Sequence, residues 1–399
     1  MSGPLEGVRV LDLTTVVMGP YATRLLGDYG ADVIKVEPPE GDIMRLSGPM
    51  RNPRMGHLYL STNRSKRSVV IDLKNIAGRE VLFRLVTRSD ALVYNLRPQA
   101  MARLNLSYEE VAAVNPQIIY AGAFGFSQRG PYAARPAYDD LIQGMSGVPW
   151  LTHKAGAETP RYAPMIFADR TVGLQFALAI VSALYHRERT GKGQRVDVPM
   201  FEGLLDVVLG EHLAGESFQP PEGPAGYVRS LTPDRRPYRT KDGYLCALVY
   251  SDKQWRAFFG AIGESERFES DARFSSHGER VRHIDAVYGY LSDVLAKRTT
   301  AQWLDLFERA DIPAARMYSI DDILKDEHLT EIGFFEDVDH PTEGSIRQLA
   351  VPTEWSASAP RLTRHAPQLG ENTVEVLRET GYDDVAIQSL LQNGAVRAH

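Results

Sequence analysis

The chain has a single cysteine, Cys246, so an internal disulfide and a zinc site built from clustered cysteines are both excluded. It also lacks an excess of positive charge, because 45 Lys and Arg residues stand against 51 Asp and Glu residues, a formal net charge of −6. A chain of this charge has no general basic field, so we expect no nucleic-acid partner. The 10 histidines show no metal-ligand spacing, and we expect no metal site.

The chain also lacks the features of a targeting or membrane segment. Its first residues do not combine a basic flank with an apolar stretch of signal-peptide length. The most apolar long run, residues 172–185, is shorter than the ~20 residues of a membrane span and contains Gln175 and Ser182. We therefore expect a cytoplasmic protein with no membrane partner.

Short apolar runs alternate with amphipathic runs through the first half of the chain, a pattern typical of βα units around a parallel sheet. The pattern predicts an α/β fold with strands at 8–14, 31–37, 69–73, 91–94 and 117–123, and helices at 20–28, 76–87 and 108–114. Ligands of such sheets bind beyond the carboxyl ends of the strands. We therefore expect a site in the loops that follow Thr14, Glu37, Tyr94 and Ala123.

The second half of the chain has a different organisation. Residues 171–186 are apolar nearly all round and predict a helix that is buried on most sides. A proline-rich stretch at 219–237 indicates a linker. Strand-like and helical segments follow to about residue 316, with helices expected at 252–262 and 300–310, and the tail 371–392 is expected to be helical.

Nucleotide-binding motifs are missing, but cations follow the predicted strands. The chain contains neither G-x-G-x-x-G nor G-x-x-x-x-G-K-[ST], so a dinucleotide dehydrogenase and a P-loop enzyme are disfavoured. Cationic side chains in strand-end loops suit a ligand that carries phosphates. The cations are Arg45, Lys66, Arg67, Arg97 and Arg103. The alternative for each of them is a solvated surface charge.

Asp169 lies between an apolar, strand-like run and the apolar helix that is expected near Thr171. A carboxylate there would be partly desolvated and close to the positive end of a helix dipole, which suits a nucleophile or a base. The alternative is an ordinary helix N-cap. Capping is also the simpler interpretation of Asp139 and Asp140, and core packing is the simpler one for Tyr250, Trp255, His283 and Cys246.

Five stretches resemble the class III CoA-transferases, or CaiB/BaiF family, which includes formyl-CoA transferase, succinyl-CoA-dependent dicarboxylate transferases and α-methylacyl-CoA racemases. They run in family order, include the sequence FADRTVG around Asp169, and cover residues 7–42, 60–74, 94–147, 167–202 and 366–377. The resemblance implies a large Rossmann-like domain, residues 1–215 plus 330–399. It also implies a linker at 216–237, an inserted smaller α+β domain at 238–329, and an interlocked homodimer.

The resemblance further implies a catalytic Asp169 and a site for coenzyme A. The CoA-contacting residues would be Val16, Val17, Glu37, Arg45, Lys66, Arg67, Asn95, Leu96, Arg97, Ala100, Met101, Arg103 and Tyr138. In this assignment the cations hold phosphates, while Ala100 and Met101 line the adenine pocket. CoA would move from an acyl-CoA donor to a carboxylic acid through an aspartyl-CoA thioester, with no permanently bound cofactor and no metal.

Two departures from the family pattern narrow the expected activity. Val17 stands where some of the transferases carry a substrate-positioning glutamine, and residues 240–255 contain one glycine in place of a glycine-rich flap. Specificity for formate or oxalate is therefore less expected than the activity of the dicarboxylate transferases that use succinyl-CoA. Arg229, Arg235 and Arg236 in the linker are candidates for binding a second carboxylate.

Two alternative functions remain open. A racemase needs acid/base groups on both faces of the α-carbon, but the G-H-D-x-x-Y segment that carries the histidine of that branch is absent here, and His153 lies past it. A catalytically silent acyl-CoA-binding protein would keep the cations without using Asp169.

Overall fold

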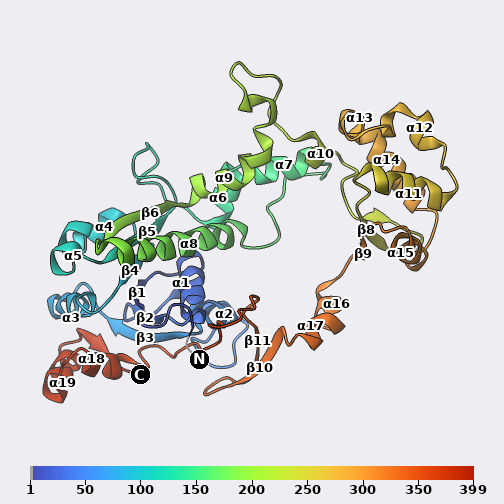
Figure 1. The fold of residues 1–399 in the computed structure, drawn as a ribbon. Coiled ribbons are helices and arrows are strands. Elements are labelled where there is room, and N and C mark those ends of the chain that lie inside the picture. Colours follow the sequence, from blue (N-terminus) through green and yellow to red (C-terminus); the bar gives the residue numbers. More distant parts are fainter. Residues whose placement is uncertain (1–2) are drawn as a thin grey trace. The chain divides into compact units, whose positions relative to one another are not determined.

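The computed structural model describes residues 3–399 and divides into two compact units. Unit 1 contains residues 1–142, 164–205 and 328–399, and unit 2 contains residues 143–163 and 206–327. The predicted domain bounds differ from this division at 143–163 and at 206–237, which belong to unit 2. Figure 1 shows the elements of both units.

Unit 1 is built on a seven-stranded sheet with the order β12-β3-β2-β1-β4-β5-β6. All neighbours pair in parallel except β12, which is antiparallel to β3. Chain order reverses between β1 and β4, which makes their carboxyl ends the switch point where ligands of such sheets bind. The strands are β1 (Arg9–Leu13), β2 (Asp32–Glu37), β3 (Lys66–Ile71), β4 (Ala91–Tyr94), β5 (Ile119–Phe124), β6 (Gln194–Pro199) and β12 (Val396–Arg397).

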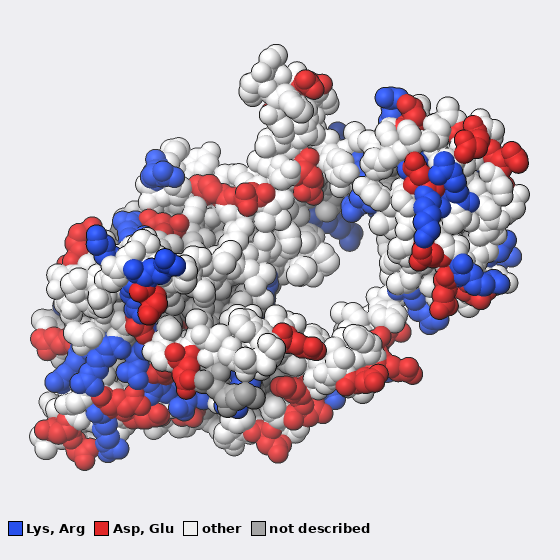
Figure 2. All heavy atoms as spheres, viewed as in Figure 1, with Lys and Arg blue, Asp and Glu red and all other residues white. Residues whose placement is uncertain are grey.

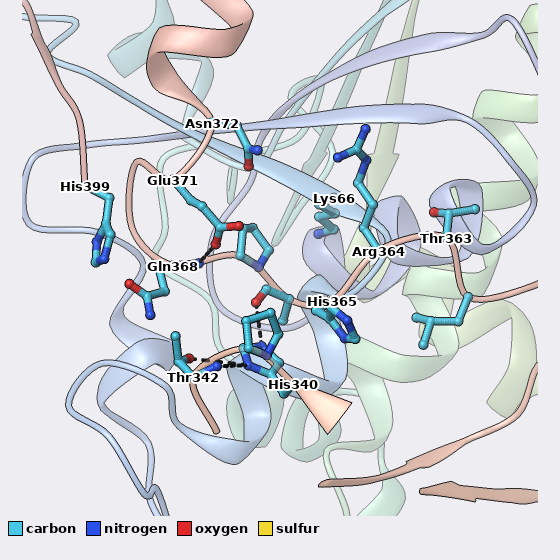
Figure 3. A pocket seen from close by; sticks show the side chains of 14 residues that line it. Lys66, His340, Thr342, Thr363, Arg364, His365, Gln368, Glu371, Asn372 and His399 are labelled. Carbon is cyan, nitrogen blue, oxygen red and sulfur yellow. Dashed lines mark hydrogen bonds between the residues drawn. The ribbon is translucent and has the colours of Figure 1, made fainter. Parts of the chain in front are cut away.

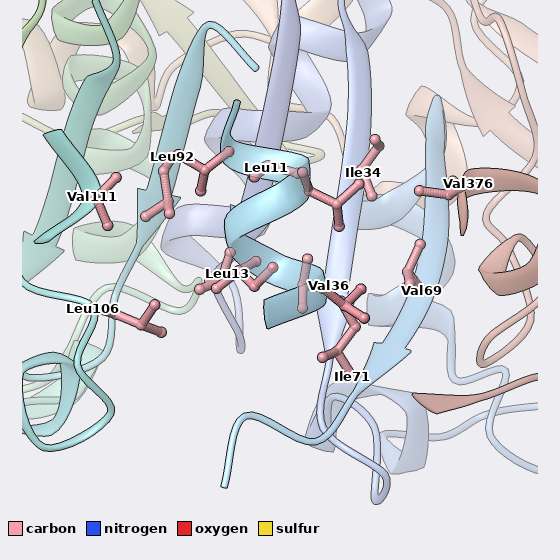
Figure 4. Close-up of a cluster of buried hydrophobic side chains, with 14 of the residues drawn as sticks. Leu11, Leu13, Ile34, Val36, Val69, Ile71, Leu92, Leu106, Val111 and Val376 are labelled. Atoms are coloured by element: carbon pink, nitrogen blue, oxygen red, sulfur yellow. The ribbon is translucent and has the colours of Figure 1, made fainter. Parts of the chain in front are cut away.

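Helices cover both faces of this sheet, as expected for a parallel sheet with a buried interior. On one face, α1 (Met18–Asp28) and α8 (Phe167–Thr190) pack against each other and against the strands. The other face carries α3 (Ile76–Val86), α5 (Tyr108–Val114), α18 (Thr373–Glu379) and α19 (Asp384–Gln392). Figure 4 shows the core on that second face, where Leu11, Ile34 and Val69 from three strands lie near Val376 of α18.

The remaining elements of unit 1 are short. Helices α2 (His57–Asn63), α4 (Pro98–Arg103) and α17 (Glu327–Glu331) and the 3₁₀ turn η1 (Ile43–Leu46) connect the layers. Strands β10 (Phe335–His340) and β11 (Gly344–Leu349) form an antiparallel hairpin. Two further helices, α6 (Asp139–Met145) and α9 (Met200–His212), begin in unit 1 and continue beyond its bounds.

Unit 2 has its own aromatic core beside a small antiparallel sheet, β7-β8-β9. Its strands are β7 (Tyr238–Arg239), β8 (Tyr244–Ala247) and β9 (Ala314–Arg316). Trp255, Phe258 and Phe259 of α11 pack with Phe274 and Trp303 in the core. The helices are α7 (Val148–Lys154), α10 (Val228–Leu231), α11 (Asp252–Ile262), α12 (Arg267–Ser270), α13 (His277–Arg282), α14 (Ile284–Leu295), α15 (Thr300–Arg309) and α16 (Ile320–Ile323), with 3₁₀ turns η2 (Ala214–Ser217) and η3 (Ala272–Phe274).

Three expectations for side chains in unit 2 are wrong. Cys246 is exposed because it alternates outward on β8, opposite the buried Leu245. Tyr250 is 46% exposed, and the ring of His283 is 45% exposed beside Glu279. Trp255 lies in the core, as expected.

Helix α8 differs from its expected form in length and in burial. It spans 24 residues and is long and apolar enough, by length and composition alone, to cross a membrane, which contradicts the expectation of too short a run. One side is buried through Val172, Phe176 and Ile180 against α1 and the sheet. The other side exposes an apolar stripe, because Leu174, Leu178 and Tyr185 are 52–67% exposed and recur at helical spacing.

Charge is mixed on the surface. On the face shown in Figure 2, Lys and Arg side chains are interspersed with Asp and Glu side chains. This distribution agrees with the net charge of −6 and gives that face no extended basic field.

Candidate active site

A cavity of about 230 Å³ lies at the carboxyl ends of four neighbouring strands, β1, β4, β5 and β6. Each strand sends the residues that follow it to the cavity wall: Val16 after β1, Asn95 and Arg97 after β4, Gly125 after β5 and Met200 after β6. The expected site at the loops after Thr14, Tyr94 and Ala123 is therefore present. The loop after Glu37 contributes no residue to this cavity.

Asp169 lines this cavity from the first turn of α8. The helix begins at Phe167, four residues before the expected start, and its N-cap is Ile166, which makes no side-chain capping bond. Asp169 is therefore the third residue of the helix and not its N-cap, so the capping interpretation is wrong. The residue is only 9% exposed.

The surroundings of Asp169 raise the pKa of its carboxyl group to about 7. Burial is the largest cause, the nearby carboxylate of Asp139 adds to it, and the guanidinium of Arg170 opposes it. Asp139 also accepts a hydrogen bond of 2.9 Å from the backbone N–H of Asp169 through Oδ1. Asp139 thus fixes the start of α8 and disfavours the ionised form of its neighbour.

The loop after β1 is strained where it meets the cavity. Val16 has a φ of 72°, a left-handed conformation that is costly for a β-branched residue. Asn95 holds this loop from both sides, because its Oδ1 accepts from Thr15 N–H at 3.0 Å and its Nδ2 donates to Thr15 O at 2.7 Å. Asp42 accepts from Val16 N–H at 3.3 Å. These bonds support a backbone conformation that Val16 alone would not adopt.

Three helices start at this cavity, since Met18 of α1, Asp169 of α8 and Met200 of α9 all line it. The first N–H groups of a helix have no intrahelical partner and carry the positive end of its dipole. Gly19 lets the first turn of α1 lie against Thr14, where a Cβ would stand 2.4 Å from that side chain. The cavity therefore combines a desolvated carboxylate with the starts of three helices, whose positive dipole ends favour negative charge.

Several of the expected CoA-contacting residues meet at this cavity. Val16, Asn95, Arg97 and Tyr138 line it together with Asp169, and Arg97 and Tyr138 are exposed. Ala100 and the exposed Arg103 lie on the following helix, α4, and Leu96 packs against the main core.

Other residues of that set have their side chains buried away from the cavity. Met101 is 1% exposed in the main core, so its side chain is not available to an adenine ring. Val17 is 2% exposed at the start of α1. Both residues are close in sequence to residues that line the cavity, but their own side chains are buried in the protein interior.

The expected phosphate-binding cations of β2 and β3 are engaged in ion pairs inside unit 1. Arg45 pairs with Glu37 at 2.6 Å, and Lys66 pairs with Asp12 at 2.9 Å, with all four side chains at most 1% exposed. Arg67 pairs with Asp32 at 2.7 Å. These bonds use the charges that a phosphate would need, so the structure gives Glu37, Arg45, Lys66 and Arg67 a structural role and does not bring them to the Asp169 cavity.

These buried pairs support the strained loop. Burial by itself would raise the pKa of Asp12, but Lys66, Lys35 and two threonine hydroxyls outweigh it and lower this pKa to about 2. Lys35 donates to Asp42 Oδ2 and to Thr14 O, both at 2.9 Å. Lys35 therefore holds the strained loop in two ways: directly at Thr14, and through Asp42 at Val16.

Sequence reasoning missed Gln128 and Arg135 of the cavity wall, and it preferred a capping role for Asp139, which also lines the cavity. Gln128 ties its own loop together by donating to Phe126 O and Ala133 O. The guanidinium of Arg135 lies 3.9 Å from the centroid of the Tyr132 ring. The sequence signal that could have found them is their position in the long loop after β5, because ligands bind at the loops that follow the strands of a parallel sheet.

Two of the three linker arginines have side-chain partners within unit 2. Arg229 donates to the Tyr288 hydroxyl at 2.9 Å, and Arg236 pairs with Asp234 at 3.1 Å.

A second cavity, of about 640 Å³, contains three histidines and is shown in Figure 3. His340 Nε2 bonds with Ala366 O at 2.9 Å, and Nδ1 accepts from Thr342 N–H, so both ring nitrogens are engaged. Lys66 reaches this wall but is paired with Asp12. Among the described residues no group of His, Cys, Asp or Glu is arranged to hold a metal ion. This cavity offers no free nucleophile comparable to Asp169.

The fold and the cavity together define an α/β enzyme with a desolvated carboxylate at the switch point of a parallel sheet. Comparison with known proteins agrees. The family described as CoA-transferase family III matches residues 5–373. The chain therefore belongs to this family, and it is a class III CoA-transferase.

Curated relatives cover nearly the whole chain. Succinyl-CoA:glutarate CoA-transferase of Mus musculus is 33% identical over 99% of this chain and 91% of its own length. Formyl-CoA:oxalate CoA-transferase of Bradyrhizobium sp. (strain ORS 278) is 32% identical over 99% of this chain and 98% of its own. A solved CaiB/BaiF family protein from Brucella suis has a TM-score of 0.79 and 30% identity, covering 95% of this chain and 100% of its own.

Proposed function

We propose that this enzyme moves coenzyme A from an acyl-CoA donor, succinyl-CoA in the first instance, to a carboxylic acid acceptor through an aspartyl-CoA thioester on Asp169. The observation that carries the proposal is the placement of Asp169, which is nearly buried, is not used as a helix cap and lines the strand-end cavity. Succinyl-CoA is favoured because the relatives at 33% identity include succinyl-CoA:glutarate and succinate–glutarate CoA-transferases.

The first half-reaction forms a mixed anhydride. A carboxylate oxygen of Asp169 attacks the thioester carbonyl of the donor, the C–S bond breaks, and the CoA thiolate leaves with the electron pair. The thiolate then attacks the aspartyl carbonyl and breaks the anhydride C–O bond. This step releases the donor acid as its carboxylate and leaves CoA on Asp169.

The second half-reaction runs the same steps in reverse with the acceptor carboxylate. Each step exchanges one acyl bond for another, so the energy of the thioester is conserved and no ATP is consumed. Helices α1 and α9 start at Met18 and Met200 in the cavity wall, and the positive ends of their dipoles favour the oxyanion that develops in each step. Arg97 and Arg135 at the rim of the cavity are the cations that can hold the phosphates of CoA or a second carboxylate of the acceptor.

The cavity does not favour the racemase alternative. A racemase needs a second acid/base group opposite the first, and no histidine is found among the described residues that line the Asp169 cavity. His153 lies on α7 with its Nδ1 bonded to Ala157 O. A silent CoA-binding protein would have no use for a desolvated carboxylate in this position.

The test compares Asp169→Asn with Asp140→Asn. Asp140 is an exposed carboxylate that does not line the cavity, so it is a matched control for removal of one acidic group. We expect Asp169→Asn to lose CoA transfer from succinyl-CoA to glutarate by at least about 10³-fold while still binding CoA, and Asp140→Asn to stay close to wild type. Hydroxylamine added during turnover should convert Asp169 to a hydroxamate, seen by peptide mass spectrometry.

Retained transfer in Asp169→Asn, or a hydroxamate on another residue, would contradict the mechanism. Epimerisation of an α-methylacyl-CoA without any transfer would support the racemase instead. Screening glutarate, oxalate, formate and acetate as acceptors identifies the acid.

We further propose that the enzyme is a homodimer. The support is the exposed apolar stripe of α8, formed by Leu174, Leu178 and Tyr185, which no part of unit 1 covers within the described residues. Light scattering after size exclusion should give twice the chain mass, and Leu178→Glu should reduce it. A monomeric wild type would contradict this proposal.

A further inference from the structure

A third cavity, of about 810 Å³, lies in unit 1 against α1, α2, the first turn of α8 and the hairpin β10–β11. It shares no lining residue with the Asp169 cavity. Five arginines reach its wall, and we call it the arginine cavity. They are Arg24, Arg51, Arg64, Arg170 and Arg347.

Two of these arginines share one carboxylate. Asp28 is completely buried and accepts a hydrogen bond of 2.9 Å from Arg64 Nη2, with the Ser65 hydroxyl bound to its other oxygen at 2.8 Å. Arg24 Nε lies 3.4 Å from the same carboxylate and is buried without a hydrogen-bond partner. One negative charge therefore faces two positive charges at this end of the cavity.

Arg170 adds a charge that no carboxylate pairs with. Among the described residues no acidic group lies within ion-pair distance of its guanidinium, which instead lies 4.5 Å from the centroid of the Tyr21 ring. Arg24 lies 5.3 Å from the same ring. Burial is the largest cause that lowers the pKa of both Arg24 and Arg170. Asp28 raises the pKa of Arg24 and Asp169 raises that of Arg170, while neighbouring guanidinium groups lower the pKa of Arg24 further. Such a cluster of like charges is stabilised by an anion.

The other two arginines leave this excess in place. Arg51 donates from Nη1 to the backbone carbonyls of Glu343 and Ser345, so its charge stays uncompensated by those contacts. Arg347 pairs with Asp337 at 3.0 Å on the surface. Glu343 also lines the cavity, and its carboxylate accepts only from neutral groups of Asn52 and Thr342, so its charge offsets that of Arg51 and the excess remains at Arg24 and Arg170.

Apolar side chains form the rest of the wall. They come from the α2 region, from the segment before α8 and from the hairpin, and they include Met50, Met55, Leu60, Met165, Phe334 and Ile346. Methionine side chains are unbranched and polarisable, so they adapt to apolar ligands of varied shape. Besides Arg24 Nε, a second donor in the wall, Gln348 Nε2, is buried without a hydrogen-bond partner.

We propose that the arginine cavity is a second binding site, separate from the Asp169 site, for a carboxylate that carries a hydrocarbon chain. The carboxylate lies between Arg24 and Arg170, whose guanidinium groups both lie near the Tyr21 ring. Arg24 shares the single charge of Asp28 with Arg64, and Arg170 has no carboxylate within ion-pair distance among the described residues. The hydrocarbon chain lies along Met50, Met165 and Ile346. The proposal does not depend on the chemistry at Asp169.

The test measures binding to the full-length protein by isothermal titration calorimetry. The probes are octanoate, octan-1-ol as the chain without the charge, acetate as the charge without the chain, and inorganic phosphate. We expect octanoate to bind at least about tenfold more tightly than the other three, because only it uses both the guanidinium groups and the apolar wall. Phosphate that binds as tightly as octanoate would overturn the assignment of ligand class.

Variants locate the bound octanoate. Arg24→Gln and Arg170→Gln should each weaken octanoate by about tenfold, whereas Arg347→Gln, a matched control that removes an arginine already paired with Asp337, should change it less than about twofold. Met165→Trp fills the cavity from an exposed position and should also weaken binding without removing a charge. Circular dichroism checks that each variant is folded.

Two results would overturn the proposal. Octanoate binding that is unchanged in Arg24→Gln, Arg170→Gln and Met165→Trp would place the ligand elsewhere. Binding that is lost in Asp169→Asn or displaced by free CoA would place it in the Asp169 cavity. Octanoate that still binds Asp169→Asn with wild-type affinity, in the presence of CoA, supports a separate site.

Discussion

Two groups of charged residues lie near the carboxyl ends of the parallel sheet, and they differ in how completely their charges are compensated. The network of Asp12, Lys35, Lys66, Glu37 and Arg45 is fully buried, and each of its charges has an oppositely charged partner. Asp169 is almost as buried but has another carboxylate, that of Asp139, as its neighbour. Burial alone therefore does not set the pKa of a carboxyl group, because the neighbouring charges act on it as well.

The two groups also depend on each other. Asp42, the ion-pair partner of Lys35 in the buried network, accepts a hydrogen bond from Val16 N–H and so holds the strained loop. That loop forms one wall of the Asp169 cavity. A network in which every charge is paired thus supports a site in which the Asp169 carboxylate has no ion-pair partner among the described residues. Variants of the two groups should therefore have opposite effects on stability.

The largest effect is expected from Lys66→Met. The substitution leaves Asp12 ionised and buried without its 2.9 Å partner, so we expect a loss of about 3–5 kcal/mol in the free energy of unfolding. Urea denaturation measures it, and Arg97→Gln, an exposed cation at the cavity rim, is the control with little expected change. Equal stability of Lys66→Met and wild type would show that the network is not structural.

The opposite sign is expected for Asp169→Asn. The pKa of this carboxyl is about 7 in the folded chain and 3.8 for an ordinary aspartate, so the folded state retains a proton that the unfolded chain releases. Stability contributed by the protonated form is therefore lost as the pH rises from about 4 to 7. Asp169→Asn does not titrate and should be more stable than wild type by about 2–4 kcal/mol at pH 8, with a gain that declines toward pH 4. A gain independent of pH would contradict this assignment.

The pH dependence of catalysis provides a third test. In the proposed mechanism the nucleophile is the carboxylate of Asp169, so kcat/KM should rise with pH and level off above an apparent pKa near 7. In Asp139→Asn the negative charge is removed while the amide oxygen can still accept from Asp169 N–H, so the midpoint should move to lower pH and the rate at pH 6 should increase. Asp140→Asn should leave the midpoint unchanged. A midpoint that stays the same in Asp139→Asn would show that the two carboxylates are not coupled.

The smallest effect is expected at Val16. Glycine relieves the left-handed backbone strain but adds conformational freedom to the unfolded chain, so Val16→Gly should change the free energy of unfolding by less than about 1 kcal/mol. The loss of a fixed loop should nevertheless raise KM for the acyl-CoA. Steady-state kinetics together with urea denaturation separate the two effects, and an unchanged KM would argue against a binding role for this loop.

Local sequence patterns predicted much of the sheet and several helices. The strand at 91–94 and the helices at 108–114 and 252–262 match the observed elements, because apolar periodicity and capping boxes are local signals. The strand expected at 69–73 instead runs over Lys66–Ile71, because the buried ion pairs let charged residues occupy the start of a central strand. Helix α8 was expected to be buried on most sides, but its outward stripe has no cover within unit 1 in the described residues.

The sequence by itself determined the alternation of strands and helices, the strand-end loops where a ligand binds, and, through resemblance, the importance of Asp169. Only the tertiary structure decided which charges are free. Lys66 and Arg97 are equivalent in a sequence, but only one strand, β2, separates β3 from β1 in the sheet, and Lys66 pairs with Asp12 of β1. Arg97 follows β4 at the switch point and stays at the cavity rim. The physical reason is that the partner of a charged side chain decides whether that side chain can bind a ligand. Lys66 and its partner Asp12 are 54 residues apart in the chain, so only the fold brings them together.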